Sequence, residues 1–346
     1  MTKVKGYAIR PVRAADLQEV FSLSMFAGAG LTSLQPDIQF LGALIAKSEA
    51  SFAGPIQTNS QTFLLVMESF DTGEIVGCAS IKTCVGTDDF MCADFAIEGG
   101  NLERPDNLIL KRTLEGFTEV GSLFLRADHR ASGAGRFLAR ARYILMANQR
   151  HLFDQPIVAQ LRGWSEDDGR APFYDEVWSD RLRMTYQQSD ARLAREGARF
   201  ILDVFEGIEI DPRALSVPAA SAIARPHPTA AGALKLLEEE GFRQADLIDL
   251  ADGGPIMVGQ IGTLSSLQTA RPVSLKISDP TPADRSGMLS NSSFSGFRAC
   301  VGAFQEAEGS VACPAFVEDF LRTADQPILF SRDPLPHLCL PRAEIY

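Results

Sequence analysis

A glycine-containing segment between two apolar stretches is the part of the sequence that could hold a phosphate. It reads RADHRASGAGRF over 126–137 and contains Arg130, Gly133, Gly135 and Arg136. Glycines let backbone N–H groups turn toward an anion, a following helix start adds partial positive charge, and the arginines add full charges. The RxxGxG spacing alone is weak evidence, because an ordinary strand-to-helix turn has the same composition.

The residues after the glycines exclude two common phosphate loops. A P-loop has Lys and then Ser or Thr after its last glycine, whereas Arg136 and Phe137 stand here. A dinucleotide fingerprint has a third glycine where this chain has Leu138. The remaining spacing is similar to that of GCN5-related acyltransferases, which hold the pyrophosphate of coenzyme A. This resemblance implies cofactor contacts at Leu123, Phe124, Leu125, Arg130, Ser132, Gly133, Ala134, Gly135 and Arg136.

The strand before the loop is expected to supply a backbone donor. EVGSLFL at 119–125 is almost continuously apolar, which indicates a strand buried on both faces. In the GCN5-related fold this strand splays at a bulge, where an exposed N–H polarises the thioester carbonyl. Gly121 and Ser122 are the expected bulge residues, and the amide of Leu123 is the expected donor.

The order of the elements supports the same fold. Apolar periodicity and turn residues predict a strand at 7–12, a helix, a hairpin of 63–69 and 74–82, the strand at 119–125, a helix after the glycine loop, and a strand at 156–163. Further on, a helix within 227–243 has Gly241 as its C-terminal cap, and a strand pair turns at 252–255.

The predicted class is α+β: a GCN5-related N-acyltransferase-like mixed sheet flanked by helices, which two tandem units could form, plus a small β-rich C-terminal domain. The expected domains are an acyl-CoA-binding core at 1–150, a second acyltransferase-like half at 151–271 with the substrate and proton-donor motifs, and the β-rich domain at 272–346.

Several segments, in order over roughly residues 7–262, resemble the arginine N-succinyltransferase family. They are GLTSL (30–34), EVGSLFL, the glycine loop with RFLARARYILM, RGWSEDDGRAPF (162–173), RPHPTAAGALKLLEEEGF (225–242) and DLADGGP (249–255). The resemblance implies succinyl transfer from succinyl-CoA to the α-amine of arginine, with Leu123 as a succinyl-CoA contact. It implies no permanently bound cofactor and no metal. The chain departs from the family pattern at 127–129, 205–209 and 247–250, which affects the acceptor more than the donor.

Two residues are candidates for proton transfer. His227, in His227-Pro228-Thr229, matches the family's proton donor, and an ordinary histidine pKa near 6.5 suits acid or base work. A capping histidine beside a helix start is the alternative for that residue. Glu119 opens the central strand, from which members of the wider fold activate the amine through water, and it is the second base candidate.

An arginine acceptor needs carboxylates for its guanidinium and a cation or amide nest for its own carboxylate. The candidates for substrate binding are Arg162, Glu166, Asp167 and Asp168, with Arg170 as a second cation, and Thr32 and Ser33 in the bend that also contains Gly28 and Gly30. A solvated acidic turn is the alternative for 166–168.

Composition limits the partners. The net charge of −11 argues against nucleic acid. The six cysteines form no CxxC pair and are expected to be reduced. No apolar run approaches the roughly 20 residues of a membrane span, and we expect a cytoplasmic protein. The resemblance implies L-arginine and succinyl-CoA as substrates, and a homo-oligomer or a pair with a paralogous subunit. Alternatives are an acyltransferase for ornithine or a polyamine, and a catalytically silent paralogue.

Overall fold

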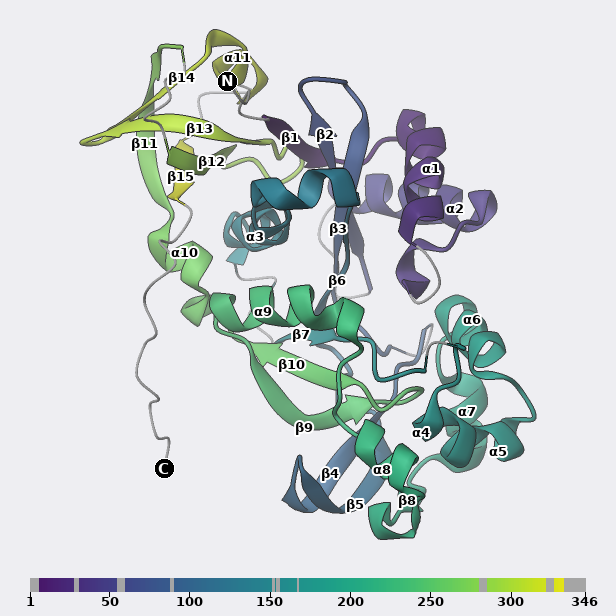
Figure 1. The fold of residues 1–346 in the computed structure, drawn as a ribbon. Coiled ribbons are helices and arrows are strands. Elements are labelled where there is room, and N and C mark those ends of the chain that lie inside the picture. The colour runs from purple at the N-terminus through teal and green to yellow at the C-terminus, as the bar shows by residue number, and fades with distance from the viewer. Residues whose placement is uncertain are drawn as a thin grey trace.

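One mixed sheet runs through the molecule. The computed structural model describes residues 6–27, 31–54, 60–87, 90–150, 153, 156–166, 168–279, 285–321 and 327–332. Over these residues the strand order is β12-β15-β11-β14-β13-β1-β2-β3-β6-β7-β10-β9-β4-β5-β8. The predicted mixed sheet flanked by helices is confirmed (Figure 1).

The N-terminal part contains the predicted strand, helix and hairpin. Its antiparallel strands are β1 (Tyr7–Pro11), β2 (Thr62–Ser69), β3 (Ile75–Lys82) and β6 (Thr118–Leu125). Helices α1 (Leu17–Ala27) and α2 (Ile38–Ala53) cover one face, and α3 (Ala134–Ala147) covers the other (Figure 1). Side chains alternate along a strand, so Phe63 and Leu65 belong to different hydrophobic clusters from Leu64 and Val66. The strands are therefore apolar on both faces.

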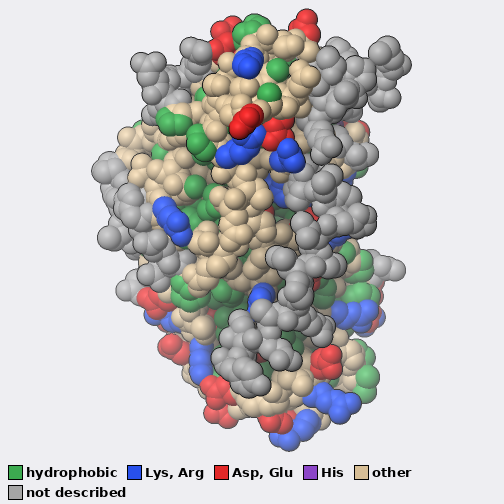
Figure 2. Space-filling view, turned by 90° about the vertical axis from the view of Figure 1, so that its left-hand side faces the viewer, with side chains coloured by type: hydrophobic (Ala, Val, Ile, Leu, Met, Phe, Trp, Pro, Cys, Tyr) green, Lys and Arg blue, Asp and Glu red, His purple; other side chains and the backbone are tan. Residues whose placement is uncertain are grey.

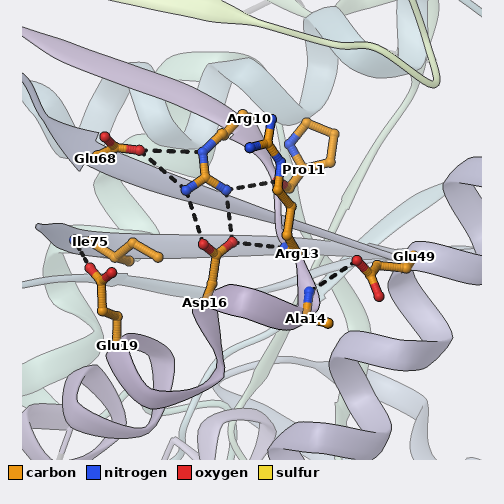
Figure 3. Close-up of polar contacts among 9 residues, drawn as sticks. All are labelled: Arg10, Pro11, Arg13, Ala14, Asp16, Glu19, Glu49, Glu68 and Ile75. Carbon is orange, nitrogen blue, oxygen red and sulfur yellow. Dashed lines mark hydrogen bonds and ion pairs between the residues drawn. The ribbon is translucent and has the colours of Figure 1, made fainter. Parts of the chain in front are cut away.

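Charged side chains tie α1 and α2 to this sheet. Arg10 of β1 donates to both carboxylate oxygens of Asp16, at 2.7 and 3.0 Å, and also to Glu68 of β2. Glu49 of α2 accepts from the backbone N–H of Ala14 at 2.9 Å (Figure 3). These contacts fix the start of α1 against β1 and β2, which are interior strands of the sheet.

The second part continues the sheet with strands β7 (Ile157–Gln160), β10 (Pro255–Gly259), β9 (Arg243–Asp249), β4 (Asp94–Asn101), β5 (Arg104–Lys111) and β8 (Glu209–Ile210). Helices α4 (Pro172–Tyr174), α5 (Asp180–Leu182), α6 (Tyr186–Glu196), α7 (Arg199–Phe205) and α8 (Val217–Ala222) lie toward one side and α9 (Ala231–Glu240) toward the other (Figure 1). Gly241 caps α9 with φ of +108°, as predicted.

The hairpin β4–β5 joins a distant part of the chain. It lies between β3 and β6 in sequence, yet Asp94 pairs with Asp249 of β9 and Leu108 pairs with Ile210 of β8. Sequence analysis did not place this hairpin. The expected domain boundary near 150 stays a prediction, because the sheet is continuous across it.

The C-terminal part is rich in β-structure. It consists of β11 (Arg271–Ile277), β12 (Arg285–Asn291), β13 (Ala299–Ala307), β14 (Ser310–Cys313), β15 (Ile328–Arg332) and α11 (Ala315–Leu321), after the short helix α10 (Ser265–Thr269). β13 pairs antiparallel with β1 through Tyr7–Val301 and Ala8–Cys300. This part therefore extends the main sheet at its N-terminal strand.

The surface carries both signs of charge. On the face seen in Figure 2, acidic and basic side chains are intermixed and do not separate into areas of one sign. Within the described part of the chain, none of the helices has the length and apolar character needed to cross a bilayer.

Candidate functional site

Strand β6 bulges at Ser122, one of the two predicted bulge residues, whereas the other, Gly121, keeps a regular pairing with Ser80. Its register against β3 shifts so that Ser122 and Leu123 both stand opposite Ala79. Ser122 has φ of +49°, a left-handed conformation that is uncommon for a residue other than glycine. A bulge inserts an extra residue and redirects the backbone next to it. The backbone at Leu123 is therefore turned out of the regular ladder with β3.

Side chains from two other elements hold this bulge. Ser80 Oγ donates to Ser122 Oγ at 2.9 Å, and the Cys78 thiol donates to the Ser122 carbonyl at 3.4 Å. Burial raises the pKa of Cys78 to about 12, so its sulfur keeps the proton that it donates. Behind the bulge, Nη1 of the buried Arg142 lies 3.4 Å from the carbonyl oxygen of Gly121.

The bulge follows, along β6, the place where two parallel strands part. β6 and β7 pair only through Thr118–Ile157 and Glu119–Val158 among the described residues. We call the end of this pairing the fork. β6 continues beyond it to Leu125, past the bulge, whereas β7 continues alongside β10. The backbone of β6 that follows the fork is thus not hydrogen-bonded to β7.

The glycine loop lies directly after β6. A 3-10 turn spans Ala127–Ser132, and Gly133 with φ of +74° is the N-cap of α3. That left-handed φ favours glycine. Gly135 is different, since a Cβ there would meet only the Leu125 side chain at an ordinary 3.6 Å. The backbone conformation therefore requires glycine at 133, whereas the fold has room for a larger residue at 135.

The two loop arginines are anchored differently. Nε of the exposed Arg130 donates to the Leu125 carbonyl at 2.8 Å, and its guanidinium lies 5.7 Å from the centre of the Phe124 ring. Arg136 forms an ion pair with Glu239 of α9 at 3.2 Å. The side chains of Phe124, Leu125 and Ala134 are buried, so only their backbone could meet a ligand. The Ser132 side chain lies outside the described part.

His227 stands at a turn that is held against the end of β7. Its backbone N–H donates to the Arg162 carbonyl at 2.9 Å, and Gly163 and Pro226 form an antiparallel bridge. Nδ1 of His227 accepts from the Thr229 N–H at 3.2 Å and lies 2.7 Å from the Thr229 hydroxyl. The histidine therefore does cap a short 3-10 turn (Pro228–Ala230). Because Nδ1 accepts, the neutral ring carries its proton on Nε2.

Glu119 lies at the fork but is engaged in an ion pair. Its Oε1 lies 3.5 Å from Nζ of Lys82, which stands opposite it on β3. This contact is the largest cause that raises the pKa of Lys82. Glu119 Oε1 also lies beside Gly121, within 3.2 Å of where a Cβ would be. The carboxylate is in place next to the bulge, beside the Lys82 ammonium.

The predicted acidic turn has an internal partner. Arg170 forms ion pairs with Glu166 and with Asp168, the latter at 2.8 Å, and all three side chains are exposed. Arg162, by contrast, is partly buried and donates to Ser165 Oγ at 3.2 Å. Asp167, Gly28 and Gly30 lie outside the described residues, as does the side chain of Thr32, while Ser33 lies in a 3-10 turn (Thr32–Leu34).

A buried carboxylate that sequence analysis treated only as part of a turn organises this region. Asp252 accepts from the backbone N–H of Gly163 at 2.8 Å, from that of Gly254 at 2.9 Å and from the Tyr186 hydroxyl at 3.0 Å. A Cβ at position 163 would lie 2.5 Å from Asp252 Oδ1, so glycine is required there. The Asp-Gly-Gly-Pro turn following a strand was the signal available in the sequence.

A second missed carboxyl lies nearby on α6. Burial and the charge of Asp252 raise the pKa of Asp190 to about 7, and Arg162 acts in the opposite direction. The hydrogen bond with Arg170 instead lowers the pKa of the exposed Asp168. The amphipathic spacing of α6 could predict that Asp190 lies on a helix. It could not predict which side chains surround the carboxyl.

Comparison with known proteins agrees with this arrangement. The family model described as arginine N-succinyltransferase beta subunit matches residues 7–266. The arginine N-succinyltransferase subunit beta of Pseudomonas aeruginosa is 30% identical over 279 residues, covering 79% of this chain and 82% of that protein. The arginine N-succinyltransferase of Enterobacter sp. is 29% identical over 302 residues, covering 84% and 87%.

A solved structure shares the whole fold. The arginine/ornithine succinyltransferase subunit AI from Pseudomonas aeruginosa superposes with a TM-score of 0.81 at 26% identity, covering 94% of this chain and 98% of that one. The similarity therefore extends through the C-terminal strands as well as the parts that contain the fork and His227. The chain belongs to the arginine N-succinyltransferase family, whose members are N-acyltransferases.

Proposed function

We propose that this chain transfers the succinyl group of succinyl-CoA to the α-amine of L-arginine, giving N2-succinyl-arginine and CoA. The observation that carries the proposal is the fork between β6 and β7. The bulge at Ser122 and Leu123 follows it on one strand, and the segment that holds His227 is bonded to the end of the other.

The donor side of the site would be formed by β6 and the start of α3. The first-turn amides of α3 and the charge of Arg130 would meet the pyrophosphate, and Gly135 would allow the backbone to approach it. The Leu123 N–H would donate to the thioester carbonyl oxygen. Phe124, Leu125 and Ala134 contribute through their backbone in this arrangement, because their side chains are buried.

The chemistry would be a direct attack. The neutral α-amine forms a C–N bond with the thioester carbon, and negative charge gathers on the carbonyl oxygen beside the Leu123 amide. The C–S bond then breaks, and the thiolate takes the Nε2 proton of His227 in its imidazolium form, which leaves the neutral ring. Glu119 is the second base, for the proton lost by the amine. Burial raises the pKa of Cys92, near Glu119, to about 11, which disfavours a cysteine acyl intermediate.

Ornithine is the second candidate acceptor, because the solved relative is named for both arginine and ornithine. Assembly with a paralogous subunit also belongs to the proposal, since two relatives are named as subunits. A cytoplasmic location is part of the same proposal.

The first test measures free thiol release with succinyl-CoA or acetyl-CoA, each with L-arginine or L-ornithine. Release that requires both succinyl-CoA and L-arginine supports the proposal. His227→Ala is expected to lower turnover by roughly 10²–10⁴ while the affinity for CoA, measured by calorimetry, stays unchanged. Tight CoA binding without thiol release for any pair would instead support a catalytically silent paralogue.

A further inference from the structure

A stacked arginine lies two residues before His227. The Arg225 guanidinium carbon lies 3.4 Å from the centre of the Trp164 ring, and the arginine side chain is exposed. Stacking on an aromatic face orients the planar guanidinium and leaves its N–H edge available for a ligand. Arg225 was not among the predicted site residues, and neither was Trp164.

The described residues supply no ion-pair partner to Arg225. Three other arginines that lie over aromatic rings are paired: Arg126 with Glu74 and Asp128, Arg192 with Glu196, and Arg271 with Glu306. The exposed Arg130, over the Phe124 ring, is like Arg225 in having no ion pair among the described residues. Among the described residues, no Asp or Glu forms an ion pair with Arg225. In a chain with a net charge of −11, an exposed guanidinium without an ion-pair partner among the described residues is available to an anionic group, and that of Arg225 lies two residues before His227.

The backbone places Arg225 and His227 on one face. Gly163 and Pro226 are directly opposite in an antiparallel bridge, and the His227 N–H bonds to the Arg162 carbonyl. Trp164 then lies opposite Arg225, consistent with their stacking. Residues on either side of a bridged pair point to the face opposite that pair. The guanidinium and the imidazole thus share a face, with their Cα atoms about 7 Å apart along an extended chain.

We propose that Arg225, oriented by Trp164, is a carboxylate-binding site of the acyl-transfer centre. This inference rests on the proposed function and names the group that the site recognises. Two substrate carboxylates have the required chemistry: the α-carboxylate of the acceptor amino acid and the terminal carboxylate of the succinyl group. A planar guanidinium binds either one through two parallel hydrogen bonds.

The α-carboxylate is the source that the geometry favours. The α-amine and the α-carboxylate are attached to one carbon, so the carboxylate must lie close to the group that handles the proton of the reaction. Arg225 is held near His227 by two backbone contacts, whereas no described contact joins it to the bulge or the glycine loop. Arg162 remains the candidate beside it, already bonded to Ser165.

The test compares Arg225→Gln and Arg225→Lys with the wild type in thiol release. Arg213→Gln is the matched control, because Arg213 is also exposed but pairs with Asp211 and lies in another turn (Pro212–Ala214). The acceptors are L-arginine and L-argininamide, in which an amide replaces the α-carboxylate. The donors are succinyl-CoA and acetyl-CoA. Trp164→Leu tests the stacking, and it should reproduce part of the Arg225→Gln effect.

If Arg225 binds the α-carboxylate, Arg225→Gln raises the KM for L-arginine by about 10- to 100-fold with either donor. The KM for L-argininamide then stays unchanged. A loss confined to succinyl-CoA, with either acceptor, assigns the site to the succinyl carboxylate. Equal kinetics for Arg225→Gln and Arg213→Gln in all four combinations overturn the proposal.

Calorimetry separates this inference from the proposed function. If the wild type releases no thiol with any pair, the proposed function fails. Titration with L-arginine, L-argininamide, succinyl-CoA and acetyl-CoA then still tests the site. The site is supported if Arg225→Gln binds L-arginine more weakly but L-argininamide as the wild type does, or succinyl-CoA more weakly but acetyl-CoA as the wild type does. The site is overturned if the wild type and the variant bind all four compounds equally.

Discussion

The two glycines of the RxxGxG loop have different physical roles although one residue separates them. Gly133 occupies a left-handed conformation at the N-cap of α3, whereas Gly135 lies within the first helical turn and has room for a methyl group. A backbone requirement and a ligand requirement can therefore be separated by substitution.

Gly135→Ala is expected to keep or increase the free energy of unfolding, by up to about 1 kcal/mol, because alanine favours a helix over glycine. Its affinity for CoA should fall, since the methyl group would stand between the backbone and the pyrophosphate. Gly133→Ala should instead lose about 1–2 kcal/mol of stability. Thermal unfolding and CoA calorimetry check both, and unchanged CoA affinity in Gly135→Ala would contradict the phosphate role.

Asp190 gives a pH dependence whose sign follows from its raised pKa. The carboxyl titrates near 4 in the unfolded chain and at about 7 in the folded protein. The folded state thus holds the proton more tightly. The resulting stabilisation is complete below about pH 4 and is lost as the pH rises through about 7.

Asp190→Asn is expected to reduce the difference between the unfolding temperatures at pH 5 and pH 8. Asp168→Asn, which removes the same charge from an exposed turn, should leave that difference as it is in the wild type. If Asp190→Asn and Asp168→Asn show the same difference between the two unfolding temperatures, the raised pKa of Asp190 is contradicted.

At the scale of elements, the bulge of β6 depends on a single strained residue and its buried partners. Ser122 adopts a positive φ while its hydroxyl bonds to Ser80 and its carbonyl accepts from Cys78. The direction of the Leu123 N–H follows from this local geometry. The strand before the loop is therefore more than a buried spacer.

Ser122→Val should destabilise the protein by about 1–3 kcal/mol and lower kcat, because a β-branched side chain is poorly compatible with the left-handed conformation. Ser122→Gly should retain the backbone conformation and lose only the hydroxyl contact. Circular dichroism melts and thiol-release kinetics distinguish the two. Full activity in Ser122→Val would show that the bulge does not position the reacting carbonyl.

At the scale of the whole molecule, the C-terminal part shares a core with the first strand. Met288, Phe297 and Val301 belong to the same hydrophobic cluster as Tyr7 and Ile9. Arg140 of α3 also donates to the carbonyl of Arg332 at 3.1 Å. The C-terminal part is thus joined to the rest of the molecule by packing and hydrogen bonds as well as by the chain itself.

A fragment that ends at Ala270 should be poorly soluble or unfold at a much lower temperature than the full chain, since it exposes the edge of β1 and part of its core. Gel filtration and thermal unfolding of the two proteins provide the check. A fragment with the full-length unfolding temperature would support an independent domain from 272 onward.

The sequence alone determined the local elements and the fold class. Apolar periodicity identified the hairpin of 63–69 and 74–82 and the buried strand at 119–125, and spacing identified the glycine turn and the Gly241 cap. These features depend on neighbouring residues, which is why they could be predicted. The resemblance of several motifs also identified the family correctly.

The tertiary structure decided which side chains meet. It pairs the β4–β5 hairpin with β9, it neutralises Glu166 and Asp168 with Arg170, and it brings Arg225 onto Trp164. The hairpin pairing and the Arg225–Trp164 stack join segments that no local periodicity or turn could bring together. The ion pairs of Arg170 are local, but the sequence pattern does not show that Arg170 meets Glu166 and Asp168. Which charges remain unpaired after folding depends on all of these contacts together, and the candidate site was therefore predictable on its loop and strand but not on its acceptor side.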